Sequence, residues 1–399
     1  MTQLNINLNL EELIASVNNS DMNELMKAMA VTVFNACMEA ERDEYIQAQR
    51  YERHGERADQ RNGYYERDYT MSIGKLKLRV PRTRNGGFST QLFSKYKRMD
   101  QAFVLGLMES VINGVSTRKV TKIVEQLCGE SISKSCVSEI MKQLDPIVDE
   151  FRNRSLTYDS FRYIYVDAVY IKVHEENHVV SKAVYIAQGV NSKDRREVLG
   201  LKIGEAESEQ NWRSFLQSLR TRGMTQPKMI ISDAHSGLVK AIREEFPGTK
   251  WQRCTAHFIR NITDKMPNKG SKHIRQLVSK VFRTRTLQEA KEARVSLEAE
   301  IGDNPKYQSS LAILDDGFMD ALQYLSEPES YHISLRTTNS LERLNLEIRR
   351  REQVIKIFPN EASGVRLIGA VLMDYHENGR KIHARFYVVL MTNNIQIAL

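Results

Sequence analysis

One stretch of the chain decides its fold: Phe161-Arg162-Tyr163-Ile164-Tyr165-Val166-Asp167. Aromatic and β-branched residues dominate this stretch, which predicts a β-strand with a carboxylate at its end. A second apolar run follows Pro227 and Lys228, and it ends in the same way: Met229-Ile230-Ile231-Ser232-Asp233. We therefore expect two strands of one sheet, each followed by an aspartate.

The segments around these two runs predict the rest of the sheet. Strand-like runs come first, at 161–167, 169–174, 179–190 and 197–203, and a helical run follows at 207–222. Then come the strand that ends at Asp233, a helix at 236–246 and a short strand-like run at 250–253. This order predicts a mixed sheet with flanking helices, as in the RNase H-like fold, against which Trp212 and Trp251 would pack. Charge-rich helical sequence at 265–330 indicates an all-helical insertion into that α/β core.

A third acidic residue, Glu342, lies near the start of a helical segment at 340–351. A single aspartate at a strand end is most often a turn residue, and a single glutamate in a helix usually faces solvent. Three carboxylates that converge repel one another and have raised pKa values unless a cation neutralises them. We therefore predict that Asp167, Asp233 and Glu342 are catalytic and hold two Mg²⁺ (or Mn²⁺) ions, which prefer oxygen ligands.

Arginines downstream of Glu342 could steady a phosphate, because their guanidinium groups match its geometry. The candidates for these DNA contacts are Arg343, Arg349, Arg350 and Arg351. Cys254 and His257 have the look of metal ligands, but a structural zinc site needs four ligands and no second pair of similar spacing exists. We expect these two residues to have a packing and hydrogen-bonding role near the site. His235 is expected to be a turn residue and not a substrate contact.

The composition limits the classes of protein to which this chain can belong. The chain has 399 residues and a formal net charge of +8, which favours a polyanionic partner without proving one. No apolar stretch is long enough to span a membrane, and the N-terminus lacks the features of a signal peptide. Four scattered cysteines suit a reducing compartment. The sequence contains no phosphate-binding glycine loop or dinucleotide fingerprint, so ATP- or NAD-dependent chemistry is not supported.

The N-terminal region reads first as a helix, whose apolar stripe contains Met22, Leu25, Met26, Met29, Val33 and Cys37. Arginines, including Arg50 and Arg53, are interleaved with tyrosines at 39–67. This segment is either a solvated helical face followed by a strand or an arm that contacts the DNA backbone. Leu76, Leu78 and Val80 alternate with basic residues in a strand that we expect to end at Pro81.

Residues 100–145 predict a helix-turn-helix. Ser116 would cap a first helix with Val120, Ile123, Val124 and Leu127 on one face, and Cys128-Gly129-Glu130 would end it. Ser133 would cap a second helix that stops near Pro146. This second helix would present outward the side chains that could touch DNA: Lys134, Ser135, Ser138 and Lys142. An ordinary helical hairpin has the same pattern, and the acidic triple together with the basic charge favours the DNA-binding interpretation.

Together these motifs resemble the Mutator family of bacterial insertion-sequence transposases. The similar stretches are 166–172, 232–238 and 79–86, and the most specific are Trp251-Gln252-Arg253-Cys254-Thr255-Ala256-His257-Phe258-Ile259-Arg260-Asn261 and 337–345 with Arg349-Arg350-Arg351. The resemblance implies an Asp-Asp-Glu triad at Asp167, Asp233 and Glu342 and an RNase H-like domain with a helical insertion. It also maps the Cys-x-x-His feature of the family onto Cys254 and His257. Ala168 and Ala234 stand where the family often has glycine, and Thr83 where it favours an acidic residue.

The resemblance further implies what the protein does and where. We expect a transposase that binds the terminal inverted repeats of its element in double-stranded DNA, cleaves a strand and joins it to target DNA. A homodimer would pair two element ends, in the bacterial cytoplasm and on the nucleoid. A plain nuclease or resolvase of the same fold, or a DNA-binding regulator without catalysis, is the alternative. The expected domains are 1–95 (DNA contact), 96–150 (helix-turn-helix), 151–264 (catalytic, first part), 265–330 (insertion) and 331–399 (catalytic, second part).

Overall fold

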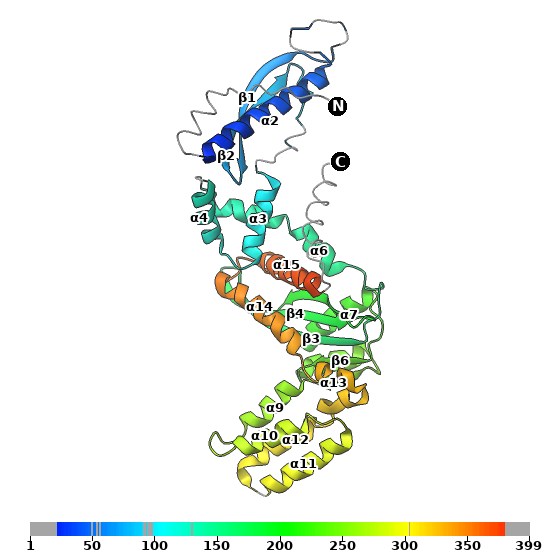
Figure 1. Ribbon diagram of the computed structural model, residues 1–399. Helices are drawn as coiled ribbons and strands as arrows, with labels where there is room; N and C mark the ends of the chain where they lie inside the picture. The colour runs from blue at the N-terminus through cyan, green and yellow to red at the C-terminus, as the bar shows by residue number, and fades with distance from the viewer. Residues whose placement is uncertain are drawn as a thin grey trace. The chain divides into compact units, whose positions relative to one another are not determined.

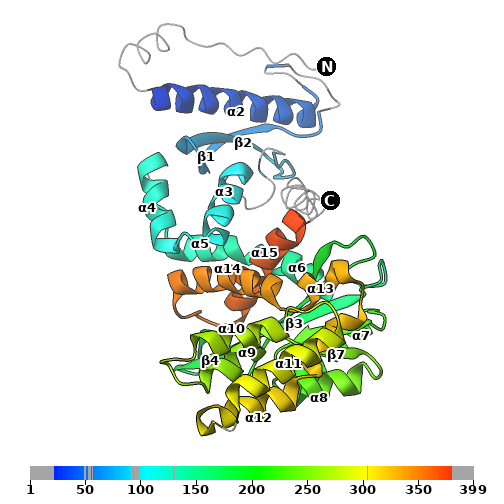
Figure 2. The ribbon, with the colours of Figure 1, turned by 60° about the horizontal axis from the view of Figure 1, so that its bottom comes forward.

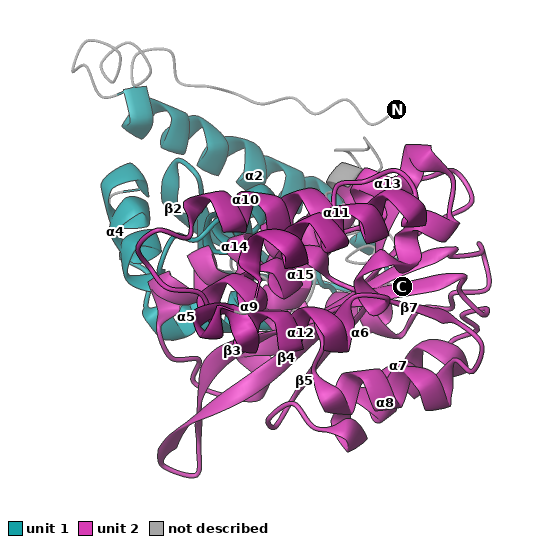
Figure 3. Ribbon diagram, turned by 90° about the horizontal axis from the view of Figure 1, so that it is seen from below, with its two compact units in different colours: residues 1–142, 394–399 teal, residues 143–393 magenta. Residues whose placement is uncertain are grey.

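The computed structural model describes residues 22–48, 51–52, 55, 57–90, 93, 99–128, 131–302 and 304–379 (Figure 1). The predictions for Arg50, Arg53, Gly129 and Glu130 lie outside these residues. So do residues 1–21 of the first expected domain and 380–399 of the last. The described residues form two compact units, one up to Lys142 and one from Gln143 onward (Figure 3). Among the described residues, no helix is both long and apolar enough to cross a membrane.

The second unit is built on a five-stranded mixed sheet in the order β5-β4-β3-β6-β7. Its strands are β3 (Tyr163–Glu175), β4 (His178–Val190), β5 (Arg196–Gly204), β6 (Met229–Ser232) and β7 (Lys250–Arg253). Strand β4 is antiparallel to its neighbours β3 and β5, whereas β6 and β7 run parallel to β3. The predicted mixed α/β architecture is confirmed.

The predicted break in the first strand is wrong. Residues 161–167 and 169–174 were expected as two runs, with Asp167 at the end of the first, but β3 continues through Asp167 to Glu175. The strand continues because β4 pairs with it without interruption, from Tyr163 opposite Val190 to Glu175 opposite His178. Only the parallel neighbour is short, since β6 pairs with β3 no further than Tyr165. Asp167 therefore lies in mid-strand, just beyond the place where β6 ends.

Two helices cover one face of the sheet, α7 (Glu209–Thr221) and α8 (Ser236–Glu245). The core between them contains Trp212, whose side chain is fully buried against Tyr185 and Phe215. Trp251 packs against the same core, and its Nε1 donates a hydrogen bond to Ser232 Oγ at 2.9 Å. Both tryptophans thus pack on the sheet as predicted.

The remaining helices of this unit are α6 (Asp145–Asn153), α9 (Thr255–Asp264), α10 (Lys272–Val281), α11 (Leu287–Ile301), η1 (Pro305–Tyr307), α12 (Gln308–Gly317), η2 (Asp320–Ser326), α13 (Glu329–Leu335), α14 (Asn339–Ile355) and α15 (Glu361–Gly379). Helices α14 and α15 pack on the face of the sheet opposite α7 and α8 (Figure 2). Phe282 packs against the rings of Phe258 and Phe318 and so joins α9, α10 and α12 around one apolar centre.

The first unit contains a hairpin, β1 (Arg61–Met71) and β2 (Gly74–Thr83), beside the long helix α2 (Met22–Ile46). Leu76, Leu78 and Val80 are buried, as their alternation predicts, but β2 continues past Pro81 to Thr83. The predicted stripe of α2 is only partly right, because the helix packs on the hairpin through a different face. Leu25 is buried, whereas the side chains exposed by 38% or more include Met22, Met26, Met29 and Val33.

Three further helices complete this unit: α3 (Gln101–Ile112), α4 (Thr117–Cys128) and α5 (Lys134–Lys142). Ser116 and Ser133 are the predicted caps, since their hydroxyl oxygens accept hydrogen bonds from the amides of Lys119 and Cys136 at 3.3 and 3.0 Å. Val120 and Val124 are buried as predicted, but Ile123 and Leu127 are not, because the neighbouring helices cover only part of α4. The four cysteines are unpaired.

Candidate functional site

An acidic cavity of about 330 Å³ brings together the three predicted carboxylates. Its lining residues come from β3, the end of β6, α9 and α14: Asp167, Ala168, Asp233, His257, Arg260, Glu342, Asn345, Leu346 and Arg349. Every one of these residues belongs to the second unit. The three side chains that were expected to converge therefore share one cavity.

The register of the sheet explains why two of them meet. Tyr165 of β3 pairs with Ile231 of β6, and the two strands are parallel. Asp167 and Asp233 each lie two residues beyond that pair, so they reach the same level of the sheet. Glu342 comes from the first turn of α14, which packs on β3 and is anchored by the buried Leu344.

Asp167 is half-buried and held at both oxygens. Its Oδ1 accepts a hydrogen bond from the amide of Ala168 at 2.8 Å, and its Oδ2 accepts one from Asn345 Nδ2 at 2.7 Å. Loss of solvent around the carboxyl group, together with the negative charge of Asp233, raises the pKa of Asp167 to about 7. A cation bound beside Asp167 would stabilise the ionised form of this carboxyl group.

His257 lies between the other two carboxylates. Its Nδ1 is 2.6 Å from Asp233 Oδ1, and its Nε2 is 3.7 Å from Glu342 Oε1. The contacts with Asp233 and with Cys254 raise the pKa of His257 to about 10, so the imidazole is protonated at neutral pH. Neither carboxylate oxygen has an aligned hydrogen-bond donor among the described residues, although both are buried. His257 acts as a counter-ion to both carboxylates, and its Nδ1 is shared between Asp233 and Cys254.

Cys254 connects the end of β7 to the start of α14. Its buried sulfur accepts hydrogen bonds from the backbone amide and the hydroxyl of Thr338, at 3.4 and 3.3 Å, and lies 3.3 Å from His257 Nδ1. Asp233, Cys254 and His257 offer three potential ligand atoms within 4.8 Å of one another. A structural zinc site needs a fourth ligand, and the described residues provide none within this cluster.

The predicted DNA contacts are distributed unevenly. Arg349 lines the cavity, whereas Arg350 and Arg351 form ion pairs with Glu347 and Arg343 is exposed outside the cavity lining. The four polar residues of α5 lie in the first unit and are exposed, as expected for an outward face: Lys134, Ser135, Ser138 and Lys142. His235 precedes α8 and does not line the cavity.

Sequence reasoning missed several lining residues, among them Asn345, Arg260 and Leu346. Asn345 follows Glu342 by three positions in α14, and Arg260 follows His257 by three in α9. Residues three apart on a helix share a face, so this spacing could have identified both. Leu346 follows Glu342 by four positions, which places it on the same face of α14.

Comparison with known proteins gives the family. The family model described as "Transposase, Mutator family" matches residues 1–381. The chain is 48% identical to the transposase for insertion sequence element IS256 in transposon Tn4001 of Staphylococcus aureus, over 94% of this chain and 96% of that protein. It is 41% identical to the transposase of element ISRM5 of Rhizobium meliloti, over 87% of this chain and 86% of that protein. The chain therefore belongs to the Mutator family of insertion-sequence transposases, enzymes that catalyse the cleavage and strand transfer of DNA.

Proposed function

We propose that the acidic cavity is the active site of an Asp-Asp-Glu transposase, in which Asp167, Asp233 and Glu342 hold two Mg²⁺ (or Mn²⁺) ions. The protein binds the terminal inverted repeats of its element, nicks one strand to free a 3′-hydroxyl and transfers that strand to a phosphate of the target DNA. The observation that carries this proposal is the convergence of the three carboxylates from β3, β6 and α14 in one cavity.

The residues of the cavity fit hard divalent cations. Glu342 Oε1 and Asn345 Oδ1 are buried and have no hydrogen-bond partner among the described residues, and Asp233 Oδ1 has only His257 Nδ1, which also faces Cys254. Such atoms are costly to bury unless a cation or a donor satisfies them. Mg²⁺ prefers oxygen ligands and is commonly held by few carboxylates together with phosphate oxygens of the substrate. The raised pKa of Asp167, which burial and the charge of Asp233 cause, also favours a cation beside this carboxylate.

When bound, two such ions would activate the attacking hydroxyl and offset the charge on the leaving oxygen. The residues of the chain supply the rest. Asn345 and the amide of Ala168 fix the orientation of Asp167 through the two hydrogen bonds to its oxygens. Arg349 and Arg260 offer guanidinium donors to a phosphate that enters the cavity.

The order of the sheet supports an RNase H-like core. Three antiparallel strands are followed along the chain by two strands parallel to the first, and α7 and α8 connect them. We infer that residues 151–264 and 331–399 form this core and that the helices of 265–330 form an insertion. We assign DNA contact to 1–95 and a helix-turn-helix to 96–150, which extends beyond the first unit and whose α5 would enter the major groove.

One experiment separates this proposal from its alternatives. Purified full-length protein is incubated with Mg²⁺ and a labelled duplex that carries the terminal repeat flanking its gene. Nicking followed by joining supports the transposase, nicking alone supports a nuclease or resolvase, and a bandshift without cleavage supports a regulator. Size-exclusion chromatography with light scattering on the DNA complex tests the expected homodimer, which would hold two element ends together.

Variants of the cavity test the roles of the residues. Asp167→Asn, Asp233→Asn and Glu342→Gln should each abolish nicking while leaving the bandshift intact. The matched control is Asp264→Asn in α9, because Asp264 is exposed, does not line the cavity and forms no ion pair within the described part of the chain. Normal nicking by any of the three carboxylate variants would refute the assignment of that residue.

A further inference from the structure

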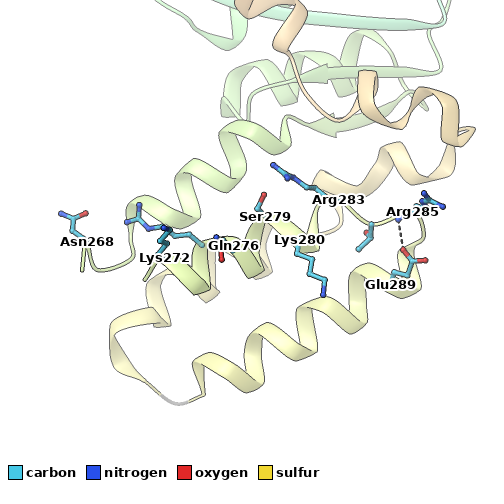
Figure 4. A pocket seen from close by; sticks show the side chains of 10 residues that line it. Asn268, Lys272, Gln276, Ser279, Lys280, Arg283, Arg285 and Glu289 are labelled. Carbon is cyan, nitrogen blue, oxygen red and sulfur yellow. Dashed lines mark hydrogen bonds between the residues drawn. The ribbon is translucent and has the colours of Figure 1, made fainter. Parts of the chain in front are cut away.

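A second cavity of about 1080 Å³ lies among the helices that follow α9. Five cationic residues and a single carboxylate line it, along α10 and the turn after it (Figure 4). The cations are Lys272, Arg275, Lys280, Arg283 and Arg285. All of its lining residues have polar or charged side chains, in contrast to those of the apolar pockets that bind small molecules.

Four of these cations have no acidic partner among the described residues. Arg285 pairs with Glu329 at 3.1 Å, but within the described residues no ion pair is formed by the other four cations: Lys272, Arg275, Lys280 and Arg283. The opposite side of α10 is apolar, since Ile274, Val278 and Val281 are buried. The basic residues therefore form one stripe along the solvent side of the helix, which we call the α10 stripe.

The N-terminal cations of the stripe do not stabilise their own helix. Lys272 and Arg275 lie in the first turns of α10, where cations face the positive end of the helix dipole, and no acidic residue accompanies them in the first turn. Ser271 does not cap the helix with its side chain, because its hydroxyl contacts that of Tyr307 at 3.1 Å. The first amides and the basic side chains are thus all suited to an anion.

We propose that the α10 stripe binds the phosphate backbone of duplex DNA. From Lys272 to Arg283 the stripe spans about 16 Å at a rise of about 1.5 Å per residue, which matches about five base-pair steps. Gln276 and Ser279 are interleaved with the cations and are further donors to phosphate oxygens. No aromatic side chain lines the cavity, so the surface lacks the stacking platforms of proteins that bind single strands.

The position of the stripe connects it to the acidic cavity. His257 and Arg260 of α9 line that cavity, and α9 leads into α10 within the same unit. We infer that a duplex whose scissile phosphate enters the acidic cavity continues along α10, where its backbone is held without regard to sequence. The path into the acidic cavity rests on the proposed active site, whereas the binding of DNA by the stripe does not require the proposed roles of the three carboxylates.

The test compares two double variants of the full-length protein. Lys272→Gln/Lys280→Gln removes two cations of the stripe, and Lys291→Gln/Lys306→Gln removes two exposed lysines of the same helical region that do not line the cavity. Affinity for duplex DNA is measured by fluorescence anisotropy over a range of NaCl concentrations, with a terminal-repeat duplex and with a random duplex of equal length. Thermal unfolding of both variants verifies that they fold like the parent protein.

The stripe variant should bind duplex DNA more weakly, and the slope of log K against log salt should be shallower by about 1.8, or about 0.9 for each lost phosphate contact. The control variant should keep the parent slope. A change confined to the terminal-repeat duplex assigns the stripe to element DNA, and a change confined to the random duplex assigns it to target DNA. A stripe variant that keeps the parent slope with both duplexes overturns the proposal, whatever the carboxylate variants do in the cleavage assay.

Discussion

Asp167→Asn should make the metal-free protein more stable, and increasingly so as the pH rises. The carboxyl group of Asp167 has a pKa near 3.8 in the unfolded chain and about 7 in the folded protein, where solvent is lost and Asp233 is close. The folded chain therefore holds this proton more tightly than the unfolded chain does. Stability is lost as the pH rises from the lower pKa through the higher one, and the loss is complete above pH 7.

The magnitude follows from this shift. Between pH 4 and pH 8 the ionisation of Asp167 should cost the folded protein about 4 kcal/mol relative to a variant that cannot ionise. An asparagine keeps the size of the side chain, and its carbonyl oxygen can still accept from Asn345 Nδ2. The effect of the asparagine on packing does not change with pH. The pH dependence of the difference in stability between the variant and the parent protein therefore reports only the ionisation of the Asp167 carboxyl group.

Tryptophan fluorescence provides the assay, because the two tryptophans of the chain, Trp212 and Trp251, both belong to the second unit. Denaturant unfolding is followed with a chelator at pH values from 4 to 8, for the parent, Asp167→Asn and the control Asp264→Asn. The difference between Asp167→Asn and the parent should grow up to about pH 7 and then level off. Added Mg²⁺ should stabilise only the proteins with all three carboxylates. A difference that stays constant with pH would refute the electrostatic account of the cavity.

Three further substitutions test the surroundings of the site. Asn345→Ala removes the donor to Asp167 and should lower the affinity for Mg²⁺, measured by thermal shift, by about 10–100-fold. Trp212→Ala opens the core between the sheet and α7 and should lower the free energy of unfolding by about 3–5 kcal/mol in denaturant titrations. Gly237→Ala places a Cβ 2.7 Å from the backbone nitrogen of Glu209, so α8 and α7 must separate and the thermal midpoint should fall.

Much of the fold could be predicted because local patterns and tertiary structure agree. The alternation of Leu76, Leu78 and Val80 specified a buried face, and Ser116 and Ser133 specified helix starts. The patterns failed where a partner element decides the outcome. The sequence of α2 offers several apolar faces, and the hairpin selects one that leaves Met26 and Met29 exposed.

The continuation of β3 was missed for a related reason. Asp167 and Ala168 interrupt the apolar run, so the local pattern indicates an end at this point. The long strand β4 nevertheless pairs across the interruption, and its hydrogen bonds keep the backbone extended. A polar residue in mid-strand is tolerated here because its side chain faces a cavity and not the core.

The sequence predicts which carboxylates form the site, but it does not predict that they lie at the same height in the sheet. Sequence alone assigns Asp167 and Asp233 to strands, whereas only the pairing of Tyr165 with Ile231 brings the two side chains to the same height. The spacing of three residues from Glu342 places Asn345 on the same face of α14, but only its contact with Asp167 shows its role.

The register of β3 links the stability of the fold to the geometry of the site. Successive side chains of a strand point to opposite faces, so a slip of β3 by one residue would move Asp167 to the face of Ile164 and Val166. Those two side chains are fully buried in the core against α7 and α8. The same slip would therefore bury a charge in an apolar core and remove it from Asp233. The apolar core on one face of β3 thus enforces the alignment of the carboxylates on the other, and the stability of the fold and the geometry of the site depend on the same register.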